Sequence, residues 1–68
     1  MVNRYYYDAV GSKGFYSGPF WGRIYKFDDS GNRIITVWRS TMAFSDPVTA
    51  RDAALEYAEE NEIDVELG

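Results

Sequence analysis

The chain has 68 residues, no cysteine and no histidine, and a formal net charge of −4. We expect residues 1–68 to form a single small domain, because a chain of this length has material for one core only. Disulfides are excluded, and the ligands of the usual zinc and iron–sulfur sites are absent. The usual nucleophile–base pairs are absent for the same reason. We therefore expect a protein that is not an enzyme and that uses no cofactor and no metal.

The first predicted element is a strand from Arg4 to Val10. It contains three consecutive tyrosines, a residue type that favours extended structure. Because side chains alternate along a strand, one side carries Tyr5, Tyr7 and Ala9, and the other carries Arg4, Tyr6, Asp8 and Val10. Tyrosine is amphipathic, so this alternation leaves open which side is buried.

Residues 11–20 are rich in glycine and serine, which is typical of a loop or wide turn. Residues 15–16 could add a short extended piece. Exposed aromatic residues in loops often mark contact sites, so Phe15, Tyr16 and Phe20 are candidates for contacts.

The central predicted element is a β-hairpin from Trp21 to Arg39. Two runs of β-branched and aromatic residues flank the turn formers of residues 28–32. Asp28 suits the first position of a type I turn and Gly31 the left-handed position after it, as in a three-residue loop closed by a bulge. That loop predicts one face made of the pairs Phe27–Arg33, Tyr25–Ile35, Arg23–Val37 and Trp21–Arg39. The other face then carries Gly22, Ile24, Lys26, Ile34, Thr36 and Trp38.

A helix is predicted next, from a start between Pro47 and Thr49 to an end near Asn61. Two starts are open: Asp46 caps the helix with Pro47 at its first position, or Thr49 and Asp52 form a capping box. The helix is amphipathic, with an acidic side of Asp52, Glu56, Glu59 and Glu60. The opposite side is rich in alanine, which allows close packing, and consists of Ala50, Ala53, Ala54, Leu55, Tyr57 and Ala58. We expect it to pack on the hairpin face that carries Gly22.

The last segment, Ile63 to Leu67, alternates apolar and acidic residues, so it either adds a short edge strand or frays. The fold class is then α+β: an antiparallel sheet of three strands, or four with this segment, with one C-terminal amphipathic helix packed on one face. The first residues do not form a secretory signal, and no apolar run reaches the roughly 20 residues that span a bilayer. We expect a cytoplasmic protein that does not contact membranes.

Charge is distributed unevenly along the chain. Residues 1–44 hold six basic and three acidic residues, a charge of +3, whereas residues 45–68 hold one basic and eight acidic residues, a charge of −7. We therefore expect a mildly basic sheet and an acidic helix.

Both faces of the predicted hairpin are partly apolar, although a two-layer domain needs only one apolar face. The face turned away from the helix combines aromatic residues with arginine, which is typical of protein interfaces and of sheets that bind nucleic acid. The candidate partner-binding residues are Trp21, Arg23, Tyr25, Phe27, Arg33 and Arg39, and the acidic helix side Asp52, Glu56, Glu59 and Glu60 is a second candidate. The alternative is that the first strand and the 11–20 loop cover this face and bury it.

Residues 21–58 resemble the AP2 DNA-binding domain. The resemblance is carried by Gly22-Arg23-Ile24-Tyr25, by Val37-Trp38-Arg39 and by the alanine-rich run of residues 49–58. In that family the exposed arginine and tryptophan face of a three-stranded sheet enters the major groove. The resemblance implies DNA contacts by Arg23, Arg33, Trp38 and Arg39. In its size, acidity and aromatic content, the chain also resembles small phage-encoded inhibitors such as anti-CRISPR proteins.

Two hypotheses of function follow. The first is a non-enzymatic protein-binding module, an inhibitor from a phage or mobile element that acts on a host defence or regulatory complex. Its acidic helix could imitate a nucleic-acid backbone towards a basic partner. The alternative is a sheet-type nucleic-acid-binding domain, which the net charge of −4 disfavours. Association of copies through the sheet is a further expectation.

Overall fold

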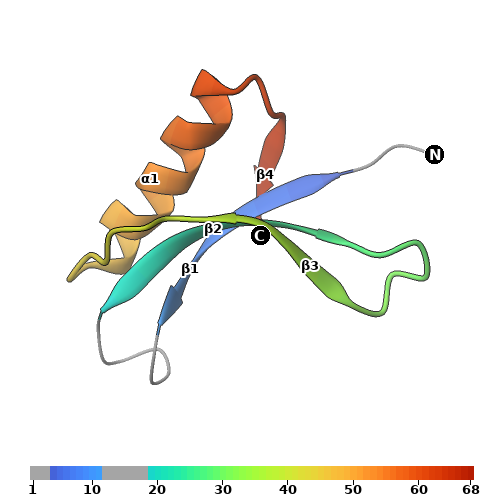
Figure 1. Cartoon of the computed structure of the whole chain (residues 1–68), viewed down its shortest axis with the longest axis horizontal. Coiled ribbons are helices and arrows are strands. Elements are labelled where there is room, and N and C mark those ends of the chain that lie inside the picture. Colours follow the sequence, from blue (N-terminus) through green and yellow to red (C-terminus); the bar gives the residue numbers. More distant parts are fainter. Residues whose placement is uncertain (1–3, 12–18) are drawn as a thin grey trace.

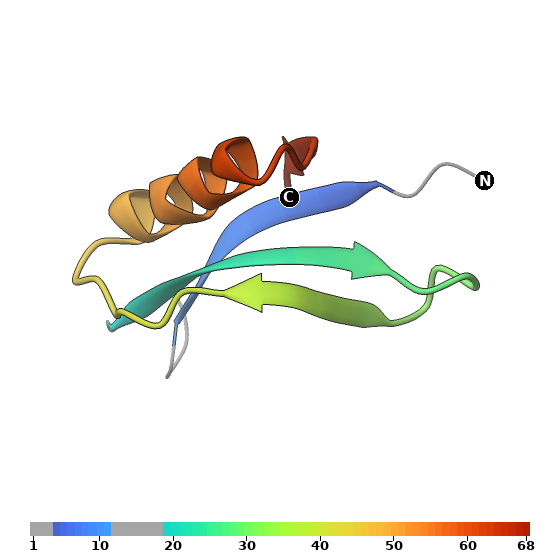
Figure 2. The same cartoon turned by 45° about the horizontal axis from the view of Figure 1, so that its top comes forward.

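A computed structural model describes residues 4–11 and 19–68. Within them the elements follow the order β1 (Tyr5–Gly11), β2 (Phe20–Phe27), β3 (Ile34–Arg39), α1 (Pro47–Glu60) and β4 (Val65–Leu67). The strands form one sheet in the order β3-β2-β1-β4, and α1 packs on one face of it (Figures 1 and 2). The predicted α+β class with one helix on the sheet is confirmed. In the described ranges no helix is long and apolar enough to cross a membrane.

The segment after the helix forms a strand, β4, and does not fray. It pairs with β1 in parallel, with Tyr5 opposite Val65 and Tyr7 opposite Leu67, whereas the pairs β1–β2 and β2–β3 are antiparallel. The sheet is therefore mixed and not wholly antiparallel. The reason is the path of α1, which starts at the end of the sheet where β3 finishes and returns the chain to the end where β1 begins (Figure 2).

The helix begins at the first of the two predicted starts. Asp46 has extended backbone (φ −127°, ψ 130°), the geometry that a residue before proline prefers, and its carboxylate accepts the backbone N–H of Thr49 at 2.9 Å. Thr49 lies inside the first turn, so the alternative capping box at Thr49 is wrong.

The core lies between the alanine face of α1 and the middle of β2. Ala50, Ala54, Ala58 and Ile24 are fully buried. The side chains packed around them are Tyr5, Tyr7, Trp38, Tyr57, Ile63 and Val65. At Gly22 a Cβ would overlap the carbonyl oxygen of Ala50, so the absence of a side chain there allows the helix to approach the sheet. The predicted packing of the alanine face on Gly22, Ile24 and Trp38 is confirmed.

The hairpin turn is one residue longer than predicted. The Asp28 carbonyl accepts the N–H of Gly31 at 3.0 Å, which closes the type I turn, and Gly31 has φ 76°, the left-handed geometry predicted for the position after it. The strands close one residue later, through the Asp28 N–H and the Arg33 carbonyl at 3.0 Å. Asn32 remains in the loop because its N–H donates to the Asp28 carboxylate at 3.0 Å. Phe27 therefore pairs with Ile34, and the predicted pairing with Arg33 is wrong.

A β-bulge in β3 shifts the register again. Tyr25 pairs with Thr36 but Ile24 pairs with Trp38, so Val37 is an extra residue on β3. The first shift places Ile34 and Thr36 on the face away from the helix and Ile35 on the helix face, the reverse of the prediction. The bulge then returns Trp38 to the helix face.

Phe20, predicted as an exposed loop residue, is a buried strand residue. It is 7% exposed at the start of β2, and two backbone hydrogen bonds of 2.8 Å join it to Phe44. Phe15 and Tyr16, the other predicted loop contacts, lie outside the described residues.

Candidate functional site

The face of the sheet turned away from α1, here called the outer face, is built by three strands. Residues directly opposite each other on neighbouring strands share a face, and this assigns each side chain. The described members are Tyr6, Asp8 and Val10 from β1, Trp21, Arg23, Tyr25 and Phe27 from β2, and Ile34, Thr36 and Arg39 from β3. Four of the six predicted site residues thus lie in line on β2, and Arg39 lies beside them.

Three aromatic rings pack together towards the hairpin end of the outer face. Tyr25 stacks on Tyr6 with ring centroids 5.5 Å apart, and Phe27 meets both rings edge-on at 5.8 and 5.9 Å. Tyr25 is only 8% exposed, whereas Phe27 is 45% exposed. Tyr6 is half-buried, so Phe27 is the most exposed member of this cluster.

Arg23 is held by the sheet itself. Its Nε and Nη2 donate to the two carboxylate oxygens of Asp8 at 3.0 and 2.6 Å, and its guanidinium lies 4.6 Å from the centre of the Tyr25 ring. The hydrogen bonds that Arg23 donates to Asp8 raise the pKa of Arg23 above its ordinary value, against the lowering effect of burial. Burial in turn raises the pKa of Tyr25, and the Asp8 charge adds to this. Arg23 thus has a stabilising partner across the strand pair before any ligand binds.

Trp21 and Arg39 form a second pair at the other end of the outer face. The Arg39 guanidinium lies 5.5 Å from the centre of the Trp21 ring, and Arg39 is exposed while Trp21 is half-buried. Arg33 lies apart from them in the exposed hairpin loop. Among the described residues neither Arg33 nor Arg39 forms an ion pair.

The predicted alternative is that the first strand lies over this face and buries it. The backbone of β1 does not lie over the face, and only its side chains contact the outer-face residues of β2. β1 pairs edge to edge with β2 and extends the sheet. Its Tyr6 and Asp8 nevertheless cover Tyr25 and Arg23. Alternation along the strand puts these two residues on one side, but it does not specify which face of the sheet that side joins. The part of the alternative that concerns the 11–20 loop falls largely outside the described residues.

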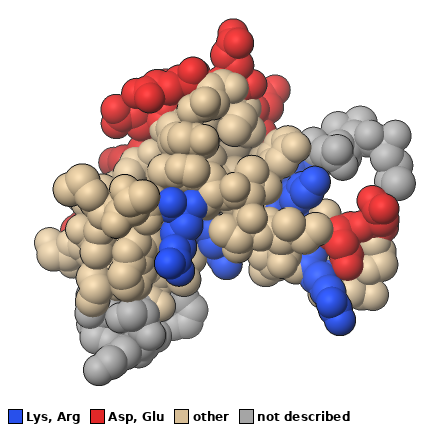
Figure 3. All heavy atoms as spheres, viewed as in Figure 1, with Lys and Arg blue, Asp and Glu red and all other residues tan. Residues whose placement is uncertain are grey.

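The acidic residues form a separate surface on the other side of the molecule. Asp52, Glu56, Glu59 and Glu60 are all exposed on α1. Figure 3 shows Asp and Glu gathered over this helix, and Lys and Arg over the sheet. The predicted separation of charge is present, and it places the two candidate surfaces on different elements.

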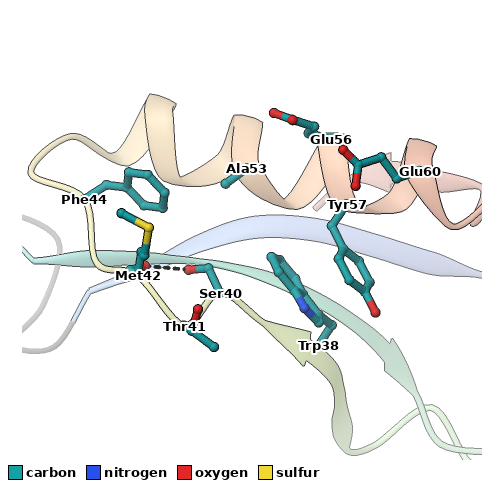
Figure 4. Close-up of a pocket in the computed structure, with 9 residues that line it drawn as sticks. All are labelled: Trp38, Ser40, Thr41, Met42, Phe44, Ala53, Glu56, Tyr57 and Glu60. Atoms are coloured by element: carbon teal, nitrogen blue, oxygen red, sulfur yellow. Dashed lines mark hydrogen bonds between the residues drawn. The ribbon is translucent and has the colours of Figure 1, made fainter.

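A groove of about 250 Å³ lies between α1 and the chain that leaves β3 (Figure 4). Its lining consists of Trp38, Ser40, Thr41, Met42, Phe44, Ala53, Glu56, Tyr57 and Glu60. Trp38 stacks on Tyr57 with centroids 4.2 Å apart and planes 12° from parallel. We call this the Trp38 groove. The sequence does not predict this groove, because residues 40–44 carry no periodic pattern.

Comparison with known proteins does not assign the chain to a family. A scan against protein-family models, a search of curated proteins and a search of solved structures each found no match. In the part of the chain that the structure describes, no three His, Cys, Asp or Glu side chains are grouped so that they could hold a metal ion. Function is therefore inferred from the shape and chemistry of the surface.

Proposed function

We propose that this protein is a small non-enzymatic binding module that contacts a protein partner through the outer face. The observation that supports this most directly is the exposure of large apolar side chains there. Phe27 is 45% exposed and its cross-strand neighbour Ile34 is 50% exposed. The only helix among the described residues lies on the opposite face, so no described element covers this pair.

The exposed cations of this face suit a protein interface. Arg39 is already stacked near Trp21, so part of the conformational entropy of its side chain is lost before binding. Arginine keeps directed donors when it is partly buried, and arginine beside aromatic rings is the usual composition of interface hot spots. Phe27 and Ile34 would supply desolvated area at one end, and Trp21 with Arg39 would supply it at the other.

Two contacts that the AP2 resemblance implies are engaged within the fold, which favours a protein partner over nucleic acid. Arg23 is paired with Asp8, and Trp38 faces α1 and stacks on Tyr57. Of the four contacts that the resemblance implies, only Arg33 and Arg39 remain available. Two arginines neutralise few phosphates, and nucleic-acid affinity depends on the number of phosphates neutralised. The narrower expectation of a phage-type inhibitor of a host complex stays a prediction, which identification of the partner would test.

The test is capture from a lysate of cells that express the protein, with and without nuclease. We expect a nuclease-resistant protein to bind the wild-type chain, and the double variant Phe27→Ala/Arg39→Ala to lose most of it. Each truncation should weaken binding by at least about 1 kcal/mol, roughly five- to tenfold, if these residues are hot spots. The matched control is Val48→Ala/Arg51→Ala, which removes one apolar and one basic side chain from α1.

Two results would contradict the proposal. Capture that survives the Phe27→Ala/Arg39→Ala change at the wild-type level would place the contact elsewhere. Recovery of nucleic acid alone, abolished by nuclease, would support the sheet-type nucleic-acid binder. Unfolding midpoints of both double variants must be measured in parallel, so that a loss of binding is not a loss of fold.

A further inference from the structure

The Trp38 groove has an aromatic wall and an acidic rim. Figure 4 shows Tyr57 on one side of the indole of Trp38, and Ser40, Met42 and Phe44 on the other. Glu56 and Glu60 lie one helical turn apart on α1 and line the groove from above. The groove therefore combines a flat π surface with two carboxylates within a single small volume.

The charges of this rim are not balanced within the described structure. The ion pairs among residues 4–11 and 19–68 are Arg23–Asp8 and Arg4–Glu66, and neither involves Glu56 or Glu60. No basic residue is among those that line the groove. A cation that entered from outside would meet two carboxylates and the face of a tryptophan, and tryptophan is the aromatic side chain that attracts cations most strongly.

The size of the groove limits what can fill it. Its volume of about 250 Å³ lies below the range of about 300–1,000 Å³ for pockets that enclose drug-sized ligands. A groove of this size suits a single long side chain presented by another molecule. Its apolar part, formed by Met42, Phe44 and Ala53, would take the methylene stem, and the rim would take the charged head.

We propose that the Trp38 groove binds an arginine side chain of a protein partner. A guanidinium is planar, stacks on aromatic faces and presents a fork of donors to carboxylates, whereas a lysine ammonium is a compact and strongly hydrated charge. This contact lies on the helix side of the sheet and is distinct from the outer face. Of the four acidic residues of α1, Glu56 and Glu60 line the groove and would contact the arginine, whereas Asp52 and Glu59 lie outside it.

The test is a titration of the ¹⁵N-labelled protein with Nα-acetyl-arginine methylamide, followed by NMR. The chain has two tryptophans, and each lies at a different candidate surface. We expect the indole N–H signal of Trp38 to shift in a saturable manner, while that of Trp21 on the outer face stays in place. The uncharged probe acetyl-norleucine methylamide should produce a much smaller shift at Trp38.

Charge-matched variants distinguish binding in the groove from a general attraction of the cationic probe to the acidic helix. Glu56→Gln and Glu60→Gln should each raise the Kd of the arginine probe about two- to fivefold, the effect of a solvent-exposed ion pair. Asp52→Asn and Glu59→Gln remove the same charge from the same helix outside the groove, and they should leave the Kd unchanged. All four side chains are exposed, so the variants should fold normally.

Three results would overturn this proposal. The first is an indole N–H signal of Trp38 that does not shift at the solubility limit of the arginine probe. The second is an equal rise of the Kd in all four variants. The third is binding of Nα-acetyl-lysine methylamide, whose side chain keeps its charge, that is as tight as binding of the arginine probe or tighter. None of them depends on the outer face. A failed capture experiment and a failed titration can therefore be told apart.

Discussion

At the scale of single residues, two side chains that the sequence predicts to be exposed are engaged within the fold, one by hydrogen bonds and one by ring stacking. Arg23 and Tyr25 read as exposed contacts, yet Asp8 and Tyr6 from the neighbouring strand engage both of them. Phe27 also meets the rings of Tyr6 and Tyr25, and Arg39 lies near the ring of Trp21, but both side chains remain exposed. The accessible part of the predicted site is therefore its two ends.

Asp28 should make stability depend on pH. Its carboxylate accepts hydrogen bonds from the Ser30 hydroxyl at 2.8 Å and from the Asn32 N–H at 3.0 Å, and these bonds lower its pKa, with the Ser30 bond contributing most. Because the pKa of the folded state is depressed, this stabilisation is present above the ordinary value of about 4 and is lost as the pH falls through the folded value.

We therefore expect Asp28→Asn to lower the free energy of unfolding at neutral pH and to have little effect in strong acid. Urea unfolding of both proteins at about pH 7 and about pH 2 measures this difference. A gap between wild type and variant that stays constant across this range would show that Asp28 stabilises the turn without its charge.

At the scale of elements, the contact between α1 and β2 determines how the two layers pack. It depends on the alanine face of the helix and on the absence of a side chain at Gly22. Small residues on both elements are required for a close approach of two backbones, so the residue types at these positions specify the contact.

Gly22→Ala should strongly destabilise the fold. The new Cβ would overlap the Ala50 carbonyl oxygen and lie 3.1 Å from the Ala54 nitrogen, and both are backbone atoms that cannot rotate away. Overpacking of this kind costs about 1–3 kcal/mol or more. Thermal and urea unfolding should show a lower midpoint, and near-ultraviolet circular dichroism should report a change in the Trp38–Tyr57 stack. An unchanged midpoint would contradict the close approach of α1 to β2.

At the scale of the whole molecule, β3 is a free edge of the sheet among the residues that the structure describes. It carries exposed apolar side chains on both faces, with Ile34 50%, Ile35 42% and Val37 43% exposed. In an antiparallel pair the hydrogen-bonded and non-bonded residues alternate. Asp28 and Arg33 are a bonded pair, so Tyr25 and Thr36 are a non-bonded pair and the N–H of Thr36 points to the free edge.

We expect weak self-association through this edge, which sedimentation velocity over a range of concentrations would detect. Thr36→Pro should reduce it, because proline removes a donor from the free edge. The unfolding midpoint should change little, since that N–H has no partner within the sheet. Identical sedimentation of the two proteins at every concentration would show that the β3 edge does not pair.

The sequence by itself determined the elements and much of their packing. The presence of α1 and its end near Asn61, the existence of the hairpin, the left-handed Gly31 and the contact of the alanine face with Gly22 all follow from local turn chemistry and from periodicity. Trp21 and Phe27 could be assigned to one face because side chains alternate along a strand. These properties depend on residues close together in the chain.

Only the tertiary structure decided the register, the order of the strands and the accessibility of the site. The extra loop residue Asn32 moved Ile34 and Thr36 to the opposite face, and the bulge at Val37 returned Trp38 and Arg39 to the faces predicted for them. The pairing of Asp8 with Arg23 and the Trp38 groove each join residues from separate elements. Alternation along a strand specifies which side chains share a face, but the partners they meet there are selected by strand pairing, which depends on contacts between segments distant in the sequence.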